Sequence, residues 1–553
     1  MFEPLTQRRY LIPFKAARLP QQFTDVLVLG AGVAGLRAAI AACDSADVIV
    51  LAKDSATESN TWYAQGGIAA VLQPADSTDL HRADTESAGA GLCDPRAVEI
   101  VVTEGPRRVL ELLPWGAQFD RQKGNAHDLA FTREGGHSFA RIVHAHGDAT
   151  GRELAETLIR TARARDNIRI VEQAFAIDLV TDNGRCIGAL ALIEGRVHIV
   201  WAKATILATG GAGQLYRETT NPRIATADGH AMAYRAGATL SDMEMVQFHP
   251  TTLYVAGASR ALITEAVRGE GAHLVDHHGH RFMPDYTDMA ELAPRDVVAR
   301  AIVEQIRKTN FTHVYLDLRH LPTERSRARF PQLAHLVDQF GMDLAKDLIP
   351  IHPAAHYMIG GVDADEQGRT SLAGLYAVGE AACSGLHGAN RLGSNSLLEG
   401  LAFGARAGAH AAAAIADARA SPPQSLEHRI PPSTRTELDI VDVKSSLRSL
   451  MWRNVGIERG GDRLTETREI IAFWSRYVMD KVFDPSSGAA AVAGWELQNL
   501  LTAAALVTAG SYSRTESRGV HYRLDYPQRD DDHWRLHLLW KRPLETPIPE
   551  PIA

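Results

Sequence analysis

The sequence predicts an α/β protein with a Rossmann-like, dinucleotide-binding domain near its N-terminus and a helical bundle near its C-terminus. Residues 24–53 read TDVLVLGAGVAGLRAAIAACDSADVIVLAK, which has the order strand, glycine-rich turn, helix, strand. Residues 437–508 carry apolar side chains at helical spacing in three successive stretches, after a segment rich in Pro and Ser at 421–433. With 553 residues, 45% of them hydrophobic and 22% charged, the chain is long enough for about two to four domains with large cores.

The opening unit is typical of a site for an ADP-containing dinucleotide. Residues 26–29 are apolar throughout, as in a parallel strand that is buried on both faces. Gly30, Gly32 and Gly35 follow as GxGxxG. The first glycine lets the chain turn, the second lets a pyrophosphate approach the backbone, and the third lets the helix pack against the strand. The helix N-terminus offers N–H groups and partial positive charge to the phosphates. A purely structural turn is the alternative, but the full strand, turn, helix and strand context favours the dinucleotide.

The second strand of this unit weakens the case for NAD. An NAD site usually ends that strand on Asp or Glu, which binds the ribose hydroxyls. Here residues 48–52 are followed by Lys53, and Asp54 comes one place late.

Charge, hydropathy and cysteine usage limit the partners and the compartment. The net charge of −8 gives nucleic acid no reason to bind. No stretch of 18 uninterrupted apolar residues predicts a membrane span, and residues 1–20 lack the apolar core of a signal peptide, so we expect a cytoplasmic protein. The four cysteines are scattered without a CxxC pair, which fits a reduced compartment and predicts neither a zinc nor an iron–sulfur site.

Several later motifs have ordinary structural interpretations when each is taken alone. The loops ESNTWYAQGGIAAV at 58–71 and TREGGHS at 132–138 are polar and contain glycine. Asp228 suits the cap of a helix, and Arg295 lies at a helix start where a surface position is natural. The segment DHHGH at 276–280 reads as a hairpin turn rather than a metal site, and we predict no metal.

Taken together, these motifs resemble the flavoprotein family that contains L-aspartate oxidase and the flavoprotein subunits of succinate dehydrogenase and fumarate reductase. The resemblance covers nearly the whole chain and rests on GAGVAG, AQGGIAA, TREGGHS, ATILATGGAG, QFHPT, LITEAVRGEG, ELAPRDVVARAI, IHPAAHYMIGGV, GLYAVGE and LHGANRLGSNSLLEGLAFG. It implies a two-dinucleotide-binding FAD domain with an inserted α+β capping domain and a C-terminal helical bundle. We therefore expect the FAD-binding domain at 23–244 and 352–425, the capping domain at 245–351 and the helical domain at 432–535. The Pro-rich final residues are expected to be irregular.

The resemblance implies that FAD is the cofactor and that it is not covalently bound. Respiratory members attach FAD to a histidine five residues before the Gln of AQGG, and Asn60 occupies that place here. Glu380 ends an apolar strand where it can accept hydrogen bonds from ribityl hydroxyls. A helix that starts near 394–396 points its N-terminus at the flavin and favours negative charge there. The predicted cofactor-binding residues are Gly30, Gly32, Val33, Ala34, Gly35, Lys53, Asn60, Thr61, Ala64, Gln65, Gly66, Gly67, Asp228, Glu380, Ser396 and Leu397.

The same resemblance implies a site for a dicarboxylate that also carries an ammonium group. Glu134 occupies the position in TREGGHS that receives the substrate ammonium, and Arg295 occupies the position of the catalytic arginine. The remaining predicted catalytic residues face the carboxylates or orient their neighbours: His249, His356, Arg391, Thr264 and Glu265. The implied reaction is oxidation of L-aspartate to iminoaspartate with oxygen or fumarate as electron acceptor, followed by hand-over to quinolinate synthase in NAD biosynthesis.

Two alternatives remain open. A soluble fumarate reductase or succinate dehydrogenase flavoprotein shares the histidines and arginines and differs at Asn60 and Glu134. A flavin-containing binding or RNA-modifying protein uses the same cofactor fold, but its basic face and additional cysteines are missing here.

Overall fold

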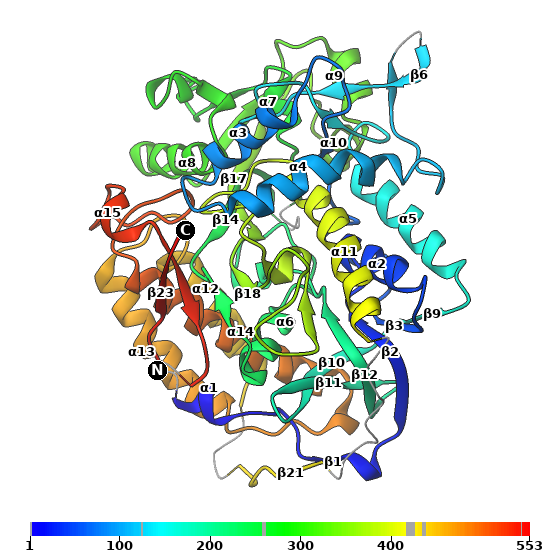
Figure 1. The fold of residues 1–553 in the computed structure, drawn as a ribbon. Coiled ribbons are helices and arrows are strands. Elements are labelled where there is room, and N and C mark those ends of the chain that lie inside the picture. Colours follow the sequence, from blue (N-terminus) through cyan, green and yellow to red (C-terminus); the bar gives the residue numbers. More distant parts are fainter. Residues whose placement is uncertain are drawn as a thin grey trace.

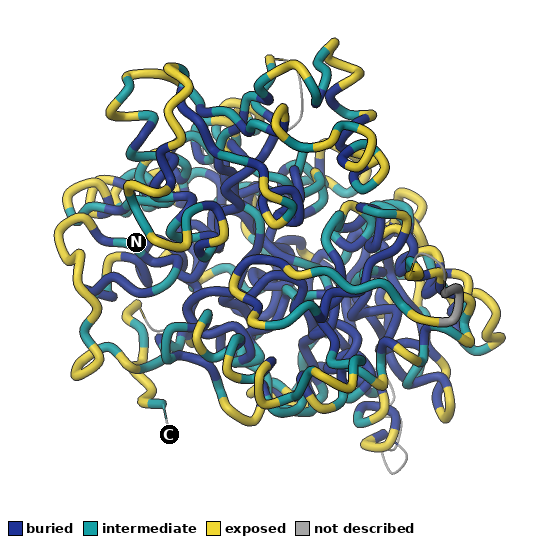
Figure 2. Tube along the Cα trace, turned by 90° about the horizontal axis from the view of Figure 1, so that it is seen from above, coloured by how far each residue is buried: buried dark blue, intermediate teal, exposed yellow. Residues whose placement is uncertain are grey.

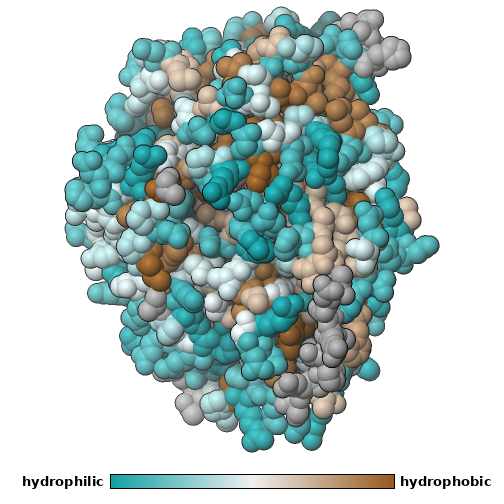
Figure 3. Space-filling model, viewed as in Figure 1, coloured by the Kyte–Doolittle hydropathy of each residue, from teal (hydrophilic) through white to brown (hydrophobic). Residues whose placement is uncertain are grey.

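The computed structural model describes residues 3–122, 125–256, 261–415, 426–433, 438–543 and 545–552. Part of the predicted Pro/Ser linker, residues 421–425, lies outside these ranges, as does the end of the predicted FAD-binding domain from residue 416. Buried residues form a continuous interior surrounded by exposed loops (Figure 2). Hydrophilic residues cover much of the face seen in Figure 3, with hydrophobic residues in small patches between them.

A seven-stranded sheet forms the centre of the FAD-binding part (Figure 1). The strands β12, β2, β3 and β9 are parallel neighbours, β19 pairs in parallel with the end of β12, and β11 and β10 extend the sheet as antiparallel strands. Their bounds are β2 (Gln21–Leu29), β3 (Val48–Leu51), β9 (Ile168–Val171), β10 (Phe175–Asp182), β11 (Arg185–Ile193), β12 (Arg196–Leu207) and β19 (Leu375–Ala377). The predicted α/β fold class and the strand, turn, helix, strand order of the first unit are confirmed.

Two helices from distant parts of the sequence lie side by side on this sheet. They are α2 (Val33–Ala42) and α11 (Asn395–Ala414), which contact each other and lie side by side in Figure 1. A Cβ atom at Gly404 would lie 2.6 Å from the carbonyl oxygen of Ala34, and one at Gly408 would lie 2.1 Å from that of Ala38. Glycine therefore allows the two backbones to approach more closely than any other residue would.

An antiparallel sheet with its own core forms the capping part. The strand order is β14, β17, β16, β15, with bounds Val246–Leu253, Ile349–Met358, Val314–Asp317 and His273–Val275. The helix α8 (Arg295–Thr309) packs on β14, and a separate cluster that includes Phe282, Ile302 and Phe330 fills the interior. The boundary predicted between residues 351 and 352 falls inside β17, which runs from the capping sheet toward the FAD-binding part. The domain boundaries stay predictions.

The C-terminal region contains the three predicted helices, α12 (Ile440–Asn454), α13 (Gly461–Val478) and α14 (Ala489–Ser513). The helix α14 is long and apolar enough to cross a membrane, but 78% of its apolar window is buried inside the protein, as in a core helix. It contacts α13, α12 and α6 (Asp228–Ala236). The helical domain therefore packs directly on the FAD-binding part (Figure 1).

The expectation of irregular structure at the C-terminus is wrong for residues 548–551. They form β23 (Ile548–Pro551), which pairs with β22 (Leu536–Trp540) at the edge of a five-stranded sheet. Proline is compatible with an edge strand because the outer side of that strand needs no N–H donor.

A buried ion pair attaches β22 to the rest of the fold and gives stability a pH dependence. Burial and the Asp242 carboxylate act in opposite directions on His537; the carboxylate prevails and raises the pKa of His537 to about 9. Because this value is above the unfolded value of about 6.5, the stability from the pair is fully present below about pH 6.5 and is lost as the pH rises through about 9. We expect His537→Gln to lower the Tm at about pH 6 and to change it much less at about pH 10. Calorimetry of both proteins at the two pH values checks this, and an equal difference in Tm at both would contradict it.

Candidate active site

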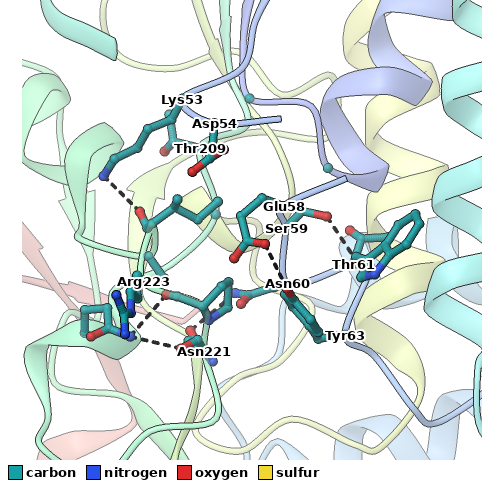
Figure 4. Close-up of a pocket in the computed structure, with 18 of the residues that line it drawn as sticks. Lys53, Asp54, Glu58, Ser59, Asn60, Thr61, Tyr63, Thr209, Asn221 and Arg223 are labelled. Atoms are coloured by element: carbon teal, nitrogen blue, oxygen red, sulfur yellow. Dashed lines mark hydrogen bonds between the residues drawn. The ribbon is translucent and has the colours of Figure 1, made fainter. Parts of the chain in front are cut away.

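A cavity of about 1940 Å³ lies at the C-terminal ends of β2 and β3. Its walls come from the turn before α2, the loop after β3, the start of α6, β17 and the start of α11. Figure 4 shows Lys53, Asn60, Thr61 and Thr209 around it. The predicted cofactor residues that line it are Gly30, Gly32, Val33, Ala34, Lys53, Asn60, Thr61, Ala64, Gln65, Asp228, Glu380, Ser396 and Leu397.

The remaining three predicted cofactor residues lie beside the cavity. Gly66 and Gly67 line a small neighbouring recess together with Glu134 and Thr264. Gly35 packs against the turn, since a Cβ atom there would lie 2.0 Å from the carbonyl oxygen of Gly30. Gly30 has φ +114°, a conformation that side chains disfavour, so the sequence prediction for the turn and for helix packing agrees with the geometry.

The cavity walls suit a ligand rich in hydroxyl and phosphate groups. Thr209 Oγ1 and Gln65 Oε1 are buried at the walls and have no hydrogen-bond partner among the described residues. Both residues supply polar side chains to the wall, although these two atoms are not themselves exposed to the cavity. The N-terminus of α2 also faces the cavity, and one of its N–H groups, that of Val33, donates to Thr61 Oγ1 at 3.0 Å.

Lys53 and Asp228 form an ion pair at one end of the cavity. Lys53 Nζ lies 2.7 Å from Asp228 Oδ2, and Asn499 Nδ2 donates to Asp228 Oδ1 at 2.7 Å. The helix-cap interpretation of Asp228 is wrong, because Ala227 is the capping residue of α6 and Asp228 is the first residue of the helix. Both side chains are already paired with protein groups and reach the cavity from its wall.

Glu380 and Asn60, which also line the cavity, are hydrogen-bonded to each other. Asn60 Nδ2 donates to Glu380 Oε2 at 2.8 Å, and the Met358 N–H donates to Glu380 Oε1 at 2.9 Å. Burial raises the pKa of Glu380 to about 7, although these two donors oppose the shift. Its carboxyl group is therefore able both to accept and, when protonated, to donate a hydrogen bond near neutral pH.

The two predicted histidines meet across the pair of strands β14 and β17. The ring centroids of His249 and His356 are 5.1 Å apart, in an edge-on arrangement. Burial lowers the pKa of both rings well below the usual value, and Arg295 lowers each further. His249 Nδ1 lies 3.2 Å from the Thr251 backbone nitrogen and 3.1 Å from the Thr251 carbonyl oxygen, so either tautomer of the neutral ring finds a partner there. His356 lines the cavity, and its Nδ1 lies 2.8 Å from Thr220 Oγ1.

The two predicted arginines share one partner that the sequence analysis missed. Gln247 Oε1 accepts hydrogen bonds from Arg295 Nη1 at 3.3 Å and from Arg391 Nε at 3.2 Å. Burial and the nearby Arg295 lower the pKa of Arg391 to about 10, so it stays a cation at neutral pH. Gln247 lies two residues before His249 on β14, and the alternation of side chains along a strand was the available signal.

Glu265 holds Arg295 from the other side. Arg295 Nε donates to Glu265 Oε2 at 2.7 Å, and Arg268 Nη2 lies 3.3 Å from Glu265 Oε1. Burial raises the pKa of Glu265, but the two guanidinium groups outweigh it and the net shift is downward. Arg295 is the first residue of α8 and is buried, so the surface interpretation of this position is wrong.

Glu134 is buried against the segment that precedes α11. Its Oε2 accepts a hydrogen bond from Ser394 Oγ at 2.7 Å. A Cβ atom at Gly393 would lie 3.0 Å from Glu134 Oε2 and 3.2 Å from Arg295 Nη2, so the carboxylate and the guanidinium converge on this glycine. The carboxylate and the guanidinium that the substrate is expected to contact thus come from segments far apart in the sequence.

The loop that carries Glu134 is fixed by a histidine outside the predicted set. His137 Nε2 lies 3.0 Å from the Gly393 carbonyl oxygen, and Arg141 Nη1 lies 3.1 Å from His137 Nδ1. Because an arginine can only donate, Nδ1 is the acceptor and Nε2 carries the proton that bonds to Gly393. The sequence analysis missed His137 and Ser394, since neither role can be read without the fold.

No group of three or more His, Cys, Asp or Glu side chains within the described ranges is arranged to hold a metal ion. The segment at 276–280 is a turn, in which the Asp276 N–H donates to the His280 carbonyl oxygen.

Comparisons with known families agree along the chain. A model described as an FAD binding domain matches residues 25–397, and a model described as the fumarate reductase flavoprotein C-terminal region matches residues 444–548. L-aspartate oxidase from Streptomyces coelicolor is 43% identical over 93% of this chain and 91% of that protein. L-aspartate oxidase 1 from Ralstonia nicotianae is 44% identical over 91% of this chain and 96% of that protein.

Solved structures show the same architecture. A mutant FrdA of E. coli quinol fumarate reductase superposes with a TM-score of 0.90 at 32% identity, with 97% of each chain covered. Adenylylsulfate reductase from Archaeoglobus fulgidus, at 18% identity and a TM-score of 0.76 over 98% of each chain, shows the fold alone. With curated relatives above 40% identity over most of its length, the chain belongs to the L-aspartate oxidase family of FAD-binding flavoproteins.

Proposed function

We propose that this protein is an FAD-dependent oxidoreductase that oxidises L-aspartate to iminoaspartate, with oxygen or fumarate as the electron acceptor. One observation carries the choice of substrate: Glu134 is a buried carboxylate that converges with Arg295 on Gly393. Arg295 in turn lies near Arg391, His249 and His356. The cationic and N–H-bearing groups suit two carboxylates, and Glu134 suits an ammonium group. Succinate has no cation to place against Glu134 and would be repelled by it.

The donors of the site divide into charged and neutral groups. Arg295 and Arg391 offer planar guanidinium groups that bind a carboxylate through two parallel hydrogen bonds. His249 and His356 are neutral rings, and each carries one N–H donor. Gln247 and Glu265 fix the orientation of the arginines, and Thr264 lies near Glu134 in the small recess. The substrate is thus held at both ends before reaction.

The residues around the cavity suit the cofactor, which when bound accepts the hydride from the substrate α-carbon. The start of α2 would hold the phosphates, Glu380 would hold the ribityl hydroxyls, and Ser396 and Leu397 at the start of α11 would contact the flavin, since all of these line the cavity. Glu134 receives the ammonium group of the substrate, and Arg295 acts as the catalytic arginine, as its position in the family implies. His249 on β14 is buried away from water, whereas His356 on β17 lines the cavity.

FAD is held without a covalent bond, since Asn60 stands where the respiratory flavoproteins carry a histidine. The Asn60 amide donates to Glu380 and has no nucleophilic nitrogen. We expect acid precipitation to release all flavin absorbance into the supernatant. Flavin that remains with the precipitated protein would contradict this.

The product has a chemical consequence for the pathway. An imine of this kind hydrolyses in water, so we propose that it passes to quinolinate synthase in NAD biosynthesis, within the cytoplasm. A second candidate function, a soluble fumarate reductase or succinate dehydrogenase, is favoured by the structural similarity to quinol fumarate reductase.

Anaerobic bleaching of the flavin absorbance separates the two candidates. L-aspartate is added to one sample of the purified protein and succinate to another. We expect rapid bleaching by L-aspartate only. Bleaching by succinate only would overturn the proposal and leave Glu134 without a role in substrate choice.

A further inference from the structure

Part of the cavity wall belongs to the helical domain, beyond the 25–397 match to the FAD binding domain. Lys444 and Arg448 of α12 line it, as do Ala489, Val492, Ala493 and Glu496 in the first turns of α14. None of them was expected to face the cofactor. The cavity therefore extends from the flavin-binding domain to a second domain that is separate in the sequence.

Three landmarks identify which end of the cavity this is. His356, Ser396 and Gln65 mark the flavin end, next to the substrate groups. The glycine-rich turn and the start of α2 mark the pyrophosphate. The third part begins at Lys53, at the end of β3, where folds of this class bind the adenosine ribose. The helical domain therefore lies at the adenosine end.

An ion-pair chain joins α14 to the end of β3 at this point. Lys53 Nζ lies 2.8 Å from Glu496 Oε1 as well as 2.7 Å from Asp228 Oδ2, and Lys444 Nζ lies 2.9 Å from Glu496 Oε2. The rings of Phe175 on β10 and Trp495 on α14 stack beside it, with centroids 5.7 Å apart. Burial lowers the pKa of Lys53, but the two carboxylates outweigh it and the net shift is upward, so the lysine is charged.

We propose that the helical domain completes the adenosine half of the FAD site. The small apolar side chains of Ala489, Val492 and Ala493 give a flat wall of the kind that a purine packs against, and Glu496 offers acceptor oxygens near the ribose hydroxyls. The inference rests on FAD being the cofactor and goes beyond the assigned reaction. It makes the docking of the helical domain and the binding of FAD thermodynamically linked.

The test uses the same substitution at two positions one turn apart on α14. Ala493 lines the cavity, whereas Ala490 is exposed and does not line it. We expect Ala493→Leu to weaken FAD binding by about tenfold, because the added side chain takes the place of the adenine. Ala490→Leu should leave the affinity unchanged. Titration of flavin-free full-length protein, followed by quenching of flavin fluorescence, measures both constants.

Competition with ADP assigns the effect to the correct half of the cofactor. ADP should displace FAD from the unmodified protein, and Ala493→Leu should weaken ADP by the same factor as FAD. If Ala493→Leu weakens the binding of FAD but not that of ADP, the wall contacts another part of the ligand and the proposal is overturned. The proposal is also overturned if ADP displaces no FAD at all from the unmodified protein.

Separate controls distinguish a folding defect and a wrong reaction from a failure of the proposal. Ala489→Leu, at an exposed position that lines the cavity, repeats the test if Ala493→Leu does not yield folded protein. FAD should raise the Tm of the Ala490→Leu protein as it does that of the unmodified protein, and should raise that of Ala493→Leu less. Normal FAD affinity in both cavity variants refutes the proposal even if L-aspartate bleaches the flavin. Conversely, a failure of L-aspartate to bleach refutes only the assigned reaction.

Discussion

Arg295→Leu is expected to abolish turnover of L-aspartate while FAD stays bound. The guanidinium lies between Glu265 and Gln247 and does not line the large cavity, so the cofactor loses no contact. The substrate loses a charged, oriented donor in a site from which water is excluded, and removal of such a donor costs at least about a hundredfold to a thousandfold in kcat. Steady-state oxygen consumption with L-aspartate measures the loss, and the flavin-to-protein ratio reports cofactor retention.

A matched control for this variant lies on the same helix. Arg300 pairs with Asp296 and bonds to the Gly519 carbonyl oxygen, away from the substrate groups. Arg300→Leu should keep near-normal turnover. An Arg295→Leu protein with turnover close to that of the Arg300→Leu protein would remove Arg295 from the mechanism.

Glu134→Gln is expected to separate the two substrates of the enzyme. Glutamine keeps the size and the hydrogen bond to Ser394 but has no charge for the ammonium group. A hydrogen bond with a charged partner contributes about 1.5–3 kcal/mol, so kcat/KM for L-aspartate should fall by about tenfold to a hundredfold or more. Fumarate carries no ammonium, and its reduction by a chemically reduced dye should stay within about threefold of normal.

Ser394 provides a control that separates the charge of Glu134 from the orientation of its side chain. Ser394→Ala removes only the donor to Glu134 and should raise KM for L-aspartate less than Glu134→Gln does. Equal loss of L-aspartate and fumarate activity in Glu134→Gln would show that the residue supports the fold of the site rather than the choice of substrate.

Local features of the sequence predicted the fold class and the glycine-rich part of the cavity wall. Gly30 and Gly35 act within a few residues of each other, so the turn and the helix packing follow from the pattern itself. His249, Arg295 and Glu134 were reached through resemblance, and the fold brings Arg295 close to each of the other two. The family role of each remains an inference that the variants above test.

The residues that sequence reasoning missed act through contacts made only in the folded chain. Gln247 is an ordinary strand residue until Arg295 and Arg391 arrive from two other segments. Glu496 follows Lys53 by more than 400 residues in the sequence, yet their side chains form an ion pair. The strand at 548–551 was missed because proline suggests irregular structure, and its tolerance depends on the edge position.

The contact between α2 and α11 sets a length. The N-terminus of α2 faces the phosphate part of the cavity and the N-terminus of α11 faces its flavin part, and Gly404 and Gly408 hold the two helices at backbone contact. The two packed helices therefore fix the distance between the phosphate part and the flavin part of the cavity. A single methyl group at Gly408 would push the two helices apart and change this distance, so a position far from any reacting atom decides whether the cofactor fits.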